Sequence, residues 1–472
     1  MRYLWRAVVG ANLVLALGAG QASALDPSEE DYELKLLGQY VFFDKISTPA
    51  RMACATCHDP KTGGTGFVAG MNQHQVAITG ADPHTVGGLR PPSNAYASLV
   101  PTFQECQLGG IGFSGIRYCG GNFWNGRAEG RDALLPGATE HVGAEVFQAS
   151  SDPQVLGYAK YFGPTTDQAI NPMPNPVEQN IDRKSVCEQV SGAAYASLYE
   201  AAWGEVLDCA DTFADVTISD ETEFDISFKR LMLAVGAFQH SSEVNSFSSK
   251  RDNALRAELA CAAGDANADP AVCTHADFLN SPGAFPLVGF TAQENAGHDL
   301  FYGAANCAIC HLSERSQPDG TGLLERYSDD AYHNIGTPMN PELPADPDPG
   351  LSAHVGVEGP RGIVRTPTLR NVDKRPGVGF TKAYSHNGWF KSLETLVHFY
   401  NTARAKPRCA EALTAREALA EDCWPAPEWE ETIPPPFLVG DLQLSADEEA
   451  ALVAYLRTLT DAYTTKEPPP YH

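Results

Sequence analysis

The chain has 472 residues, of which 59 are acidic and 33 are basic, so its formal net charge is −26. This acidic excess makes nucleic acid and anionic membrane surfaces poor partners, because both repel a negatively charged protein. The length is typical of two to three domains.

The first 24 residues have the pattern of a secretory signal peptide. Arg2 and Arg6 precede an apolar run over residues 7–19, and small residues at 22–24 form a cleavage site. The run is too short to span a bilayer comfortably, and no later segment approaches transmembrane length. We therefore expect an exported chain without a membrane span, with a formal charge near −28 after cleavage.

Apolar spacing predicts helices over residues 32–43, 224–238 and 446–460. The third opens with a capping box, in which Ser445 precedes Glu448 by three positions. Its expected buried stripe comprises Leu452, Val453, Tyr455, Leu456 and Leu459. Segments rich in Pro and Gly are expected to be loops, namely residues 60–120, 264–290 and 334–362. Strand signals are few, so the predicted fold class is mainly α with long loops.

Two complete CxxCH motifs lie 253 residues apart in the chain. They comprise Cys54, Cys57 and His58, and then Cys307, Cys310 and His311. In this motif the two thiols bond to the haem vinyl groups and the adjacent His ligates the iron. A zinc half-site would need a second pair of ligands at zinc spacing, and none follows either motif. The motifs therefore predict two covalently bound haem c groups, and such proteins are assembled in the bacterial periplasm.

The two motifs follow similar lead-in segments. Gly38-Gln-Tyr-Val-Phe-Phe precedes the first, and Gly297-His-Asp-Leu-Phe-Tyr precedes the second. This weak internal repeat indicates two cytochrome c-like haem domains. We expect a signal peptide over residues 1–24, an N-terminal haem domain with inserted segments over residues 25–285, and a C-terminal haem domain over residues 286–472.

Eight cysteines remain after the haem motifs are counted. An even remainder in an oxidising compartment predicts four disulfides, which would pin irregular loops. The connectivity cannot be deduced from sequence, but pairing of nearest neighbours is the simplest of 105 arrangements. The expected pairs are Cys106–Cys119, Cys187–Cys209, Cys261–Cys273 and Cys409–Cys423.

Several further segments resemble the dihaem cytochrome c peroxidase family, whose branches include MauG-like enzymes. Residues 365–371, Arg-Thr-Pro-Thr-Leu-Arg-Asn, followed by His386-Asn-Gly, resemble the C-terminal signature of that family. Residues 123–128 resemble its inter-haem tryptophan motif, and the segment over residues 168–178 resembles the loop above its N-terminal haem. The order agrees along nearly the whole mature chain. The 43 residues that separate Trp124 from this loop exceed the usual spacing, which predicts added surface loops.

The resemblance implies that the N-terminal haem reacts with hydrogen peroxide. By this resemblance Glu178 is the acid/base, Gln168 lies over the iron, and Pro172 limits the distal space. Peroxide cleavage needs such a base and an open iron position. The alternative for Gln168 and Glu178 is ordinary loop solvation. Trp124 would relay oxidation between the haems, and its alternative is a buried structural tryptophan.

Tyr400 is the expected sixth ligand of the C-terminal haem. In the family register this ligand falls fourteen positions after His386. Electron-transferring peroxidases carry Met there, whereas MauG-like enzymes carry Tyr, so the resemblance is closer to the MauG-like branch. A thioether favours ferrous iron, whereas an anionic oxygen favours ferric and higher oxidation states. The alternative is a core aromatic in a helix over residues 393–401.

Two histidines lie in the segment where family peroxidases place a ligand that blocks the first haem. These are His84 and, as the weaker candidate, His74. The surrounding residues depart from the family turn, so we expect His84 to be a surface loop histidine.

The resemblance also implies one calcium ion between the haems, bound largely by backbone carbonyls. Thr381 and Ala383 lie in the matching register. The third protein ligand falls on Arg90 rather than on an asparagine, which weakens this expectation.

The leading hypothesis is a periplasmic dihaem enzyme that reacts with hydrogen peroxide and stores two oxidising equivalents over both haems. It would then oxidise a Trp or Tyr side chain of a partner protein, giving kynurenine or a quinone cofactor. The alternatives are a cytochrome c peroxidase that takes electrons from a small cytochrome or cupredoxin, and a plain dihaem electron carrier. Ala305 stands where the MauG-like pattern has the surface Trp that passes oxidation out. Another exit is therefore needed, and the candidates are Trp203, Trp389, Trp424 and Trp429.

Overall fold

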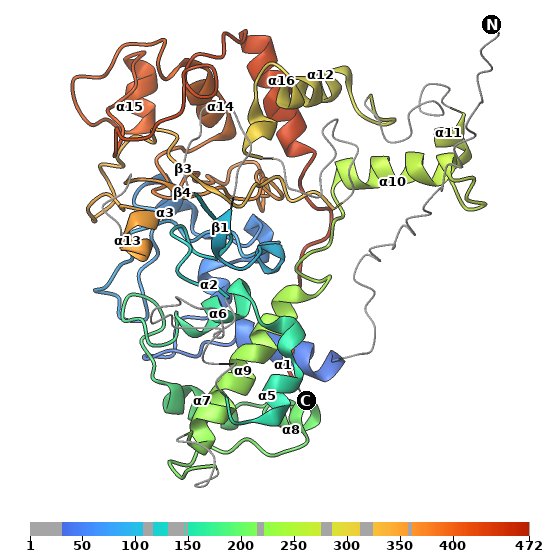
Figure 1. The fold of residues 1–472 in the computed structure, drawn as a ribbon, viewed down its shortest axis with the longest axis vertical. Coiled ribbons are helices and arrows are strands. Elements are labelled where there is room, and N and C mark those ends of the chain that lie inside the picture. The colour runs from blue at the N-terminus through green and yellow to red at the C-terminus, as the bar shows by residue number, and fades with distance from the viewer. Residues whose placement is uncertain are drawn as a thin grey trace, which may run out of the picture.

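The computed structural model describes residues 31–106, 117–130, 147, 150–214, 221–274, 286–311, 324–356 and 361–471. The predicted signal peptide, residues 1–24, lies outside this part of the chain. The fold is mainly helical with long irregular connections, as predicted (Figure 1). Among the helices of the described ranges, none combines the length and apolar character needed to cross a membrane.

In the described ranges, the regular structure consists of helices and four very short strands. The α-helices are α1 (Tyr32–Phe43), α2 (Cys54–Cys57), α3 (Ala69–Gln73), α5 (Pro153–Gly157), α6 (Pro164–Ile170), α7 (Arg183–Ser191), α8 (Ser197–Trp203), α9 (Glu223–His240), α10 (Lys250–Ala262), α11 (Pro270–Cys273), α12 (Ala292–Tyr302), α13 (Leu351–Val355), α14 (Leu393–Thr402), α15 (Ala415–Ala420) and α16 (Ala446–Arg457). The 3-10 helices are η1 (Pro60–Thr62), η2 (Ala97–Leu99), η3 (Ala159–Tyr161) and η4 (Cys307–Ile309). Two antiparallel pairs join β1 (Gln104–Cys106) to β2 (Arg117–Cys119), and β3 (Tyr332–His333) to β4 (Val364–Arg365).

The hydrophobic residues form two main cores, which we call the N-terminal and the C-terminal core. The N-terminal core is built on α1 and α9 with α5 to α8 around them, in the lower half of Figure 1. The C-terminal core lies between α12, α14 and α16, in the upper half. The haem motifs follow α1 and α12, so each core supports one motif.

The internal repeat has a physical basis in two glycines. A Cβ added to Gly38 on α1 would lie 1.9 Å from the backbone oxygen of Ala234 on α9. A Cβ added to Gly297 on α12 would lie 2.0 Å from the backbone oxygen of Ala451 on α16. Only glycine permits such close helix crossings, so the same residue recurs at the same place in each lead-in.

The helix predictions are confirmed with small shifts at the ends. The first is identical to α1, and the second lies within α9, which starts at Glu223 after the N-cap Thr222. In α16 the capping box is present, since Ser445 Oγ accepts from the Glu448 amide at 3.3 Å and Glu448 Oε2 accepts from the Ser445 amide at 2.8 Å. The predicted stripe of α16 is buried, although the helix ends at Arg457 rather than at residue 460.

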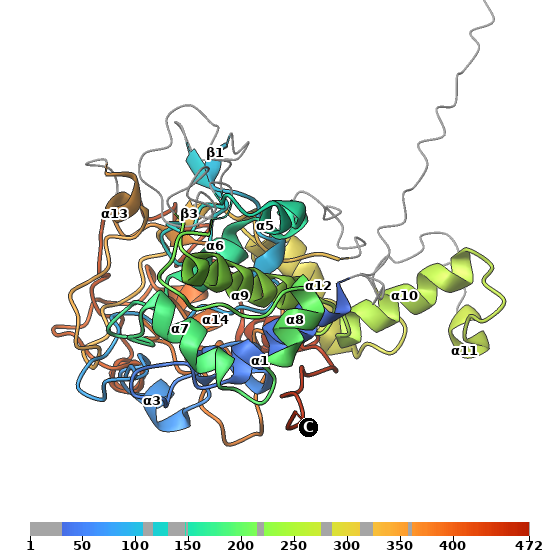
Figure 2. The same cartoon turned by 90° about the horizontal axis from the view of Figure 1, so that it is seen from below.

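All four predicted disulfide pairings are confirmed. Cys106–Cys119 joins β1 to β2, and Cys261–Cys273 joins α10 to α11. The α10–α11 arm projects from the body of the molecule in both views (Figures 1 and 2). The Cys261–Cys273 disulfide therefore stabilises this projecting arm and not a hydrophobic core.

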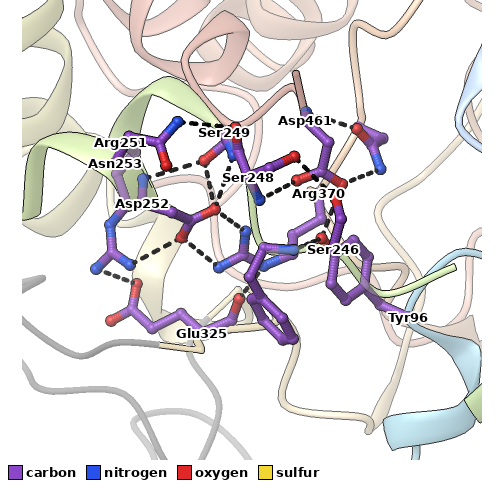
Figure 3. A network of polar contacts seen from close by, with 12 residues as sticks. Tyr96, Ser246, Ser248, Ser249, Arg251, Asp252, Asn253, Glu325, Arg370 and Asp461 are labelled. Carbon is purple, nitrogen blue, oxygen red and sulfur yellow. Dashed lines mark hydrogen bonds and ion pairs between the residues drawn. The ribbon is translucent and has the colours of Figure 1, made fainter. Parts of the chain in front are cut away.

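A buried polar network connects α10 to the C-terminal core (Figure 3). Arg370 donates two hydrogen bonds to Asp252, at 2.7 and 2.9 Å, and Arg251 donates to Glu325 at 3.1 Å. Arg370 Nε also donates to the backbone oxygen of Glu325. The network thus holds the segment that runs from Glu325 to Tyr327.

The same network reaches the C-terminal end of the chain. Asp461 accepts hydrogen bonds from the Tyr96 hydroxyl and from Asn371 Nδ2, each at 2.7 Å (Figure 3). A Cβ added to Gly63 would lie 2.6 Å from the Cβ of Asn371, so the segment after the first haem motif packs directly on Asn371. Residues 370–371 therefore contact the segments that follow both haem motifs.

Candidate active site

The two CxxCH histidines are held in the same way. His58 Nδ1 lies 3.1 Å from the backbone oxygen of Gly64, and His311 Nδ1 lies 2.9 Å from that of Tyr327. A carbonyl only accepts, so each Nδ1 carries the proton and each Nε2 offers its lone pair. Burial lowers the pKa of both imidazoles, which keeps them in the neutral form that ligates iron.

The four motif cysteines are the free cysteines of the chain, since the other eight form disulfides. Burial raises the pKa of Cys54, Cys57 and Cys307 to about 12, so these thiols stay protonated. Uncharged thiols beside a neutral imidazole fit covalent attachment of a haem. Cys310 also lies close to Asp329 and His333, and these three side chains could together hold a metal ion, although a structural zinc site uses four protein ligands.

Each motif opens on a large cavity. The N-terminal cavity consists of two adjoining spaces of about 500 and 1180 Å³, which share six lining residues: Met52, Cys57, His58, Gln168, Glu178 and Gln239. The C-terminal cavity has a volume of about 1760 Å³, and Cys307, Cys310 and His311 line it. Both sites thus combine an oriented imidazole, two free thiols and open space, as a covalently bound haem requires.

The predicted distal residues meet in the N-terminal cavity. Gln168 comes from α6, and Pro172 and Glu178 come from the loop that follows α6. Asn175 organises this loop, because its carbonyl accepts from the amides of Glu178 and Asn180, each at 3.0 Å. The distal residues therefore stand together on one short, internally bonded segment.

The Glu178 carboxyl is held at one oxygen. Asn175 Nδ2 donates to Glu178 Oε1 at 2.6 Å. Burial raises the pKa of Glu178 above its ordinary value, against the opposing effects of the Asn175 hydrogen bond and the nearby Arg127 charge. A carboxyl whose pKa moves toward neutrality is suited to exchange a proton during turnover.

Neither candidate blocking histidine reaches the N-terminal cavity. His84 is exposed on a turn, where its amide donates to Asp82 Oδ1 at 2.9 Å. His74 is also exposed, with its Nδ1 2.6 Å from Glu342 Oε1. Within the described ranges, His58 is the sole histidine that lines this cavity.

Trp124 lines both the N-terminal and the C-terminal cavity. Its side chain is 5% exposed, and its indole Nε1 donates to the backbone oxygen of Arg90 at 2.8 Å. The Trp124 carbonyl accepts from the Arg365 amide at 2.9 Å. The His386 ring packs edge-on against the Trp124 indole, with the ring centroids 6.2 Å apart. This indole is therefore fixed between the two cavities.

Tyr400 lies on α14 and lines the C-terminal cavity together with His311. Burial raises the pKa of its phenol, and the fields of Cys310 and Cys307 act in the same direction. Within the described part of the chain its hydroxyl makes no hydrogen bond. A cation inside the cavity would stabilise the negative charge of a phenolate. These surroundings fit a phenol that ligates iron.

The wall of the C-terminal cavity is basic. Arg90, Arg365, Arg370 and Lys382 line it, and no Asp or Glu does so within the described ranges. His333 also lines it: burial opposes its protonation, but Asp329, at 2.8 Å, and Cys310 together raise the pKa of His333 to about 10. The two arginines of residues 365–371 were visible as a motif, whereas no sequence pattern marks Lys382 or His333.

The residues around Thr381 and Ala383 do not fit a calcium ion. The Thr381 carbonyl already accepts from Asn72 Nδ2 at 3.1 Å. Gln73 Nε2 donates to Thr381 Oγ1 at 3.1 Å, and Arg90 and Lys382, which belong to the expected register, are both buried and both basic. Calcium takes six to eight oxygen ligands, and the two positive charges would repel it. The expectation of calcium at Thr381 and Ala383 is therefore not supported.

Comparison with known proteins agrees with this geometry. A model of the di-haem cytochrome c peroxidase family matches residues 33–260. The methylamine utilization protein MauG of Paracoccus denitrificans is 30% identical over 461 residues, which cover 95% of this chain and 93% of that protein. A cytochrome-c peroxidase of Denitromonas iodatirespirans is 28% identical over 141 residues, which cover 26% of this chain and 34% of that protein.

Solved structures share the fold. The dihaem peroxidase BthA of Burkholderia thailandensis matches with a TM-score of 0.58 and 23% identity, covering 92% of this chain and 87% of that one. A MauG-like protein associated with microbial copper homeostasis matches with a TM-score of 0.55 and 20% identity, covering 93% of each chain. The chain belongs to the dihaem cytochrome c peroxidase and MauG family, whose members are peroxidase-type oxidoreductases with two haem c groups.

Proposed function

We propose that the chain is a periplasmic dihaem enzyme that reacts with hydrogen peroxide and oxidises a Trp or Tyr side chain of a partner protein. The observation that carries the proposal is Tyr400, which lines the same cavity as His311. An anionic oxygen ligand favours oxidised iron and disfavours the delivery of ordinary reducing electrons. This ligand set suits an enzyme that holds oxidising equivalents until a partner binds.

When bound, the haem pair supplies the reaction with peroxide and holds the two oxidising equivalents. The chain supplies the proton transfer. Asn175 fixes Glu178 Oε1, so Oε2 is the oxygen that takes and returns a proton. Gln168 and Pro172 line the same space, where the amide orients a polar guest and the ring limits its size.

Trp124 is the residue we propose for electron transfer between the two sites. Its indole lines both cavities and is fixed by the hydrogen bond to the Arg90 carbonyl. The Arg90 guanidinium lies 5.3 Å from the centre of the ring and adds a cation–π contact. A rigid, oxidisable aromatic between the two cavities would divide one long electron transfer into two shorter ones.

For the exit toward the partner we propose Trp429. Its ring packs on Gly362, since a Cβ added there would lie 2.4 Å from Trp429 Cδ1, and Gly362 lines the C-terminal cavity. Trp429 is partly exposed, whereas Trp203, Trp389 and Trp424 are buried. Ala305 is buried as well and cannot serve as an aromatic exit.

The exit proposal can be tested without knowing the partner. In the absence of a partner, excess peroxide should add oxygen to Trp429 before it modifies Trp389 or Trp424. Peptide mapping by mass spectrometry after a short peroxide treatment of the holoprotein measures this order. Earlier modification of a buried tryptophan would contradict the route through Trp429.

The domain boundaries and the location are also proposals. We infer an N-terminal haem domain over residues 25–285 and a C-terminal haem domain over residues 286–472, which agrees with one core per haem motif. Residues 1–24 would direct the chain to the periplasm as a signal peptide.

A conventional cytochrome c peroxidase is the second candidate. The local similarity to a cytochrome-c peroxidase of Denitromonas iodatirespirans favours it. A plain electron carrier has no use for Glu178, Gln168 and Pro172 around one open cavity. The conventional enzyme would draw electrons from a small cytochrome or cupredoxin rather than from side chains of a substrate protein.

The variant Tyr400→Met separates the two candidates. If the proposal holds, the variant keeps both haems covalently attached but loses the long-lived oxidised state that peroxide produces in the wild type. Absorption spectra recorded over minutes after one equivalent of peroxide measure this lifetime. A Tyr400→Met variant with an unchanged lifetime would remove Tyr400 from the mechanism and favour the conventional peroxidase.

A further inference from the structure

Lys382 is a buried lysine that connects the two halves of the molecule. Its side chain is 5% exposed, and it lines the C-terminal cavity. Its ammonium donates to three backbone oxygens: Thr62 at 2.7 Å, Asn371 at 2.7 Å and Lys374 at 3.2 Å. Thr62 ends the 3-10 helix that follows the first haem motif, whereas Asn371 and Lys374 belong to the C-terminal half. One ammonium therefore ties together segments from both sides.

The hydrogen-bond count shows that this site fits an ammonium. A protonated lysine has three N–H donors and no acceptor, and three carbonyls receive them. A neutral amine would turn its lone pair toward one of these oxygens. Burial and the neighbouring Arg90 lower the pKa of Lys382 well below its ordinary value, and Asp373 acts in the opposite direction. The three carbonyl acceptors also favour the charged form.

Arg90 is the second buried cation at this place. It is 9% exposed and lines both haem cavities. Arg90 Nε donates to the Ser385 carbonyl at 2.7 Å, and the Arg90 amide donates to the His386 carbonyl at 2.8 Å. Its backbone oxygen is the acceptor for the Trp124 indole. The Arg90 side chain therefore contributes a positive charge to the walls of both cavities.

Among the described residues that line the C-terminal cavity, none offers a carboxylate to Lys382 or Arg90. Asp373, whose charge reaches Lys382, is hydrogen-bonded to Arg375 at 2.6 Å and to Arg457 at 3.1 Å. The described lining of the C-terminal cavity contains no acidic residue. A divalent cation placed here would meet two fixed positive charges and carbonyls that already accept hydrogen bonds.

We propose that Lys382 and Arg90 are fixed cations beside the haem cavities, and that the place around Thr381 and Ala383 therefore binds no calcium ion. The ammonium links the Thr62 carbonyl of the N-terminal half to the Asn371 and Lys374 carbonyls of the C-terminal half. The site is therefore built for a protein cation and is independent of calcium.

The test uses the purified dihaem protein. After dialysis against a calcium chelator, we expect well under one calcium per chain by elemental analysis and no heat of binding on titration with calcium chloride. Chelation should also leave the low-temperature electron paramagnetic resonance spectrum of the ferric haems unchanged. One calcium per chain that resists dialysis, or a spectrum that changes with chelation and recovers with calcium, would overturn the proposal.

Two lysine variants test the role of the ammonium itself. Lys382→Met keeps the chain length and removes the three hydrogen bonds, so we expect the thermal midpoint to fall by roughly 5 °C and the ferric haem spectrum to shift. Lys391→Met is the matched control, because Lys391 also donates to two carbonyls, at 3.0 and 2.8 Å, but lines neither haem cavity. Equal effects of both variants on the spectrum would contradict the inter-haem role. If Lys382→Met does not fold, the calcium measurements on the wild type still decide the question.

Discussion

Replacing Glu178 by Gln removes the proposed proton acceptor with little change in shape. In the wild type, Asn175 Nδ2 donates to Glu178 Oε1 at 2.6 Å, and the carbonyl oxygen of the introduced glutamine can accept the same hydrogen bond. The other oxygen is replaced by an amide nitrogen that cannot take a proton at neutral pH. General acid–base groups contribute 10²- to 10⁴-fold, so Glu178→Gln should slow the peroxide reaction by roughly 10²-fold or more. This corresponds to about 2.7 kcal/mol or more in the activation barrier.

The fold should not suffer from this change. Burial raises the pKa of Glu178, so the folded state holds its proton more strongly than the unfolded state does. The ionised carboxylate therefore costs stability as pH rises through the folded pKa, and an amide avoids this cost. We expect the midpoint of thermal unfolding at neutral pH to be unchanged or slightly raised. A slower reaction could then not be attributed to unfolding.

The assay is stopped-flow absorption of the ferric holoprotein mixed with hydrogen peroxide across pH. In the wild type the rate should fall as pH drops through the raised pKa of Glu178, because the base becomes protonated. Glu178→Gln should abolish this limb of the profile. Glu188→Gln is the matched control, since Glu188 is exposed on α7 and lines neither cavity. An unaffected rate in Glu178→Gln, or an unchanged acid limb, would refute the assignment.

Three further changes test other parts of the structure. Trp124→Phe should make the ferric signal of the C-terminal haem respond to peroxide later than that of the N-terminal haem, and a simultaneous response in freeze-quenched samples would exclude a relay through Trp124. Asp252→Asn breaks the buried pair with Arg370 and should lower the free energy of unfolding by about 3–5 kcal/mol. Because Arg370 depresses the pKa of Asp252, this stabilisation is present at neutral pH and is lost as pH falls; denaturant unfolding at two pH values checks both statements, and equal losses at low and neutral pH would contradict them. Gly297→Ala forces α12 away from α16 and should cost about 1–3 kcal/mol, whereas Gly157→Ala, with open space around it, should be neutral in the same assay.

The parts of the fold that depend on local patterns could be predicted from the sequence. The capping box of α16 is a local signal and is present as predicted. The repeated lead-in before each haem motif was also visible in the sequence, whereas the close helix crossing at its glycine became clear only in the structure. The four disulfides followed from short spacings in an oxidising compartment. In the capping box and in the four disulfides, the interacting residues lie close together in the chain. Paired cysteines in an exported protein also have one common structural role, which is to form disulfides.

The interactions that join the two haem sites could not be predicted. Arg370 meets Asp252 across 118 positions, and Lys382 meets the Thr62 carbonyl across 320 positions. A lysine that donates to backbone oxygens leaves no mark in the sequence, because its acceptors are present at every residue. The calcium expectation depended on register alone, and the charges of Arg90 and Lys382 became decisive only once their burial was known.

The positions of the candidate ligand and distal residues could be predicted only in part. The family register led to Tyr400 and to Glu178, and the structure places them in the C-terminal and the N-terminal cavity. Register alone did not reveal that Asn175 holds one oxygen of Glu178. The register did predict an inter-haem place for Trp124, which lines both cavities. Chemical roles for these residues remain predictions that the variants above address.

Low-temperature electron paramagnetic resonance of the purified ferric protein tests the central claim most directly. Spectra are compared before and immediately after one equivalent of hydrogen peroxide. The account predicts one high-spin haem, in the open N-terminal cavity, and one low-spin haem, ligated by His311 and Tyr400, with both signals lost together. Two low-spin haems that react only after prior reduction would contradict it, and would make this chain a conventional cytochrome c peroxidase.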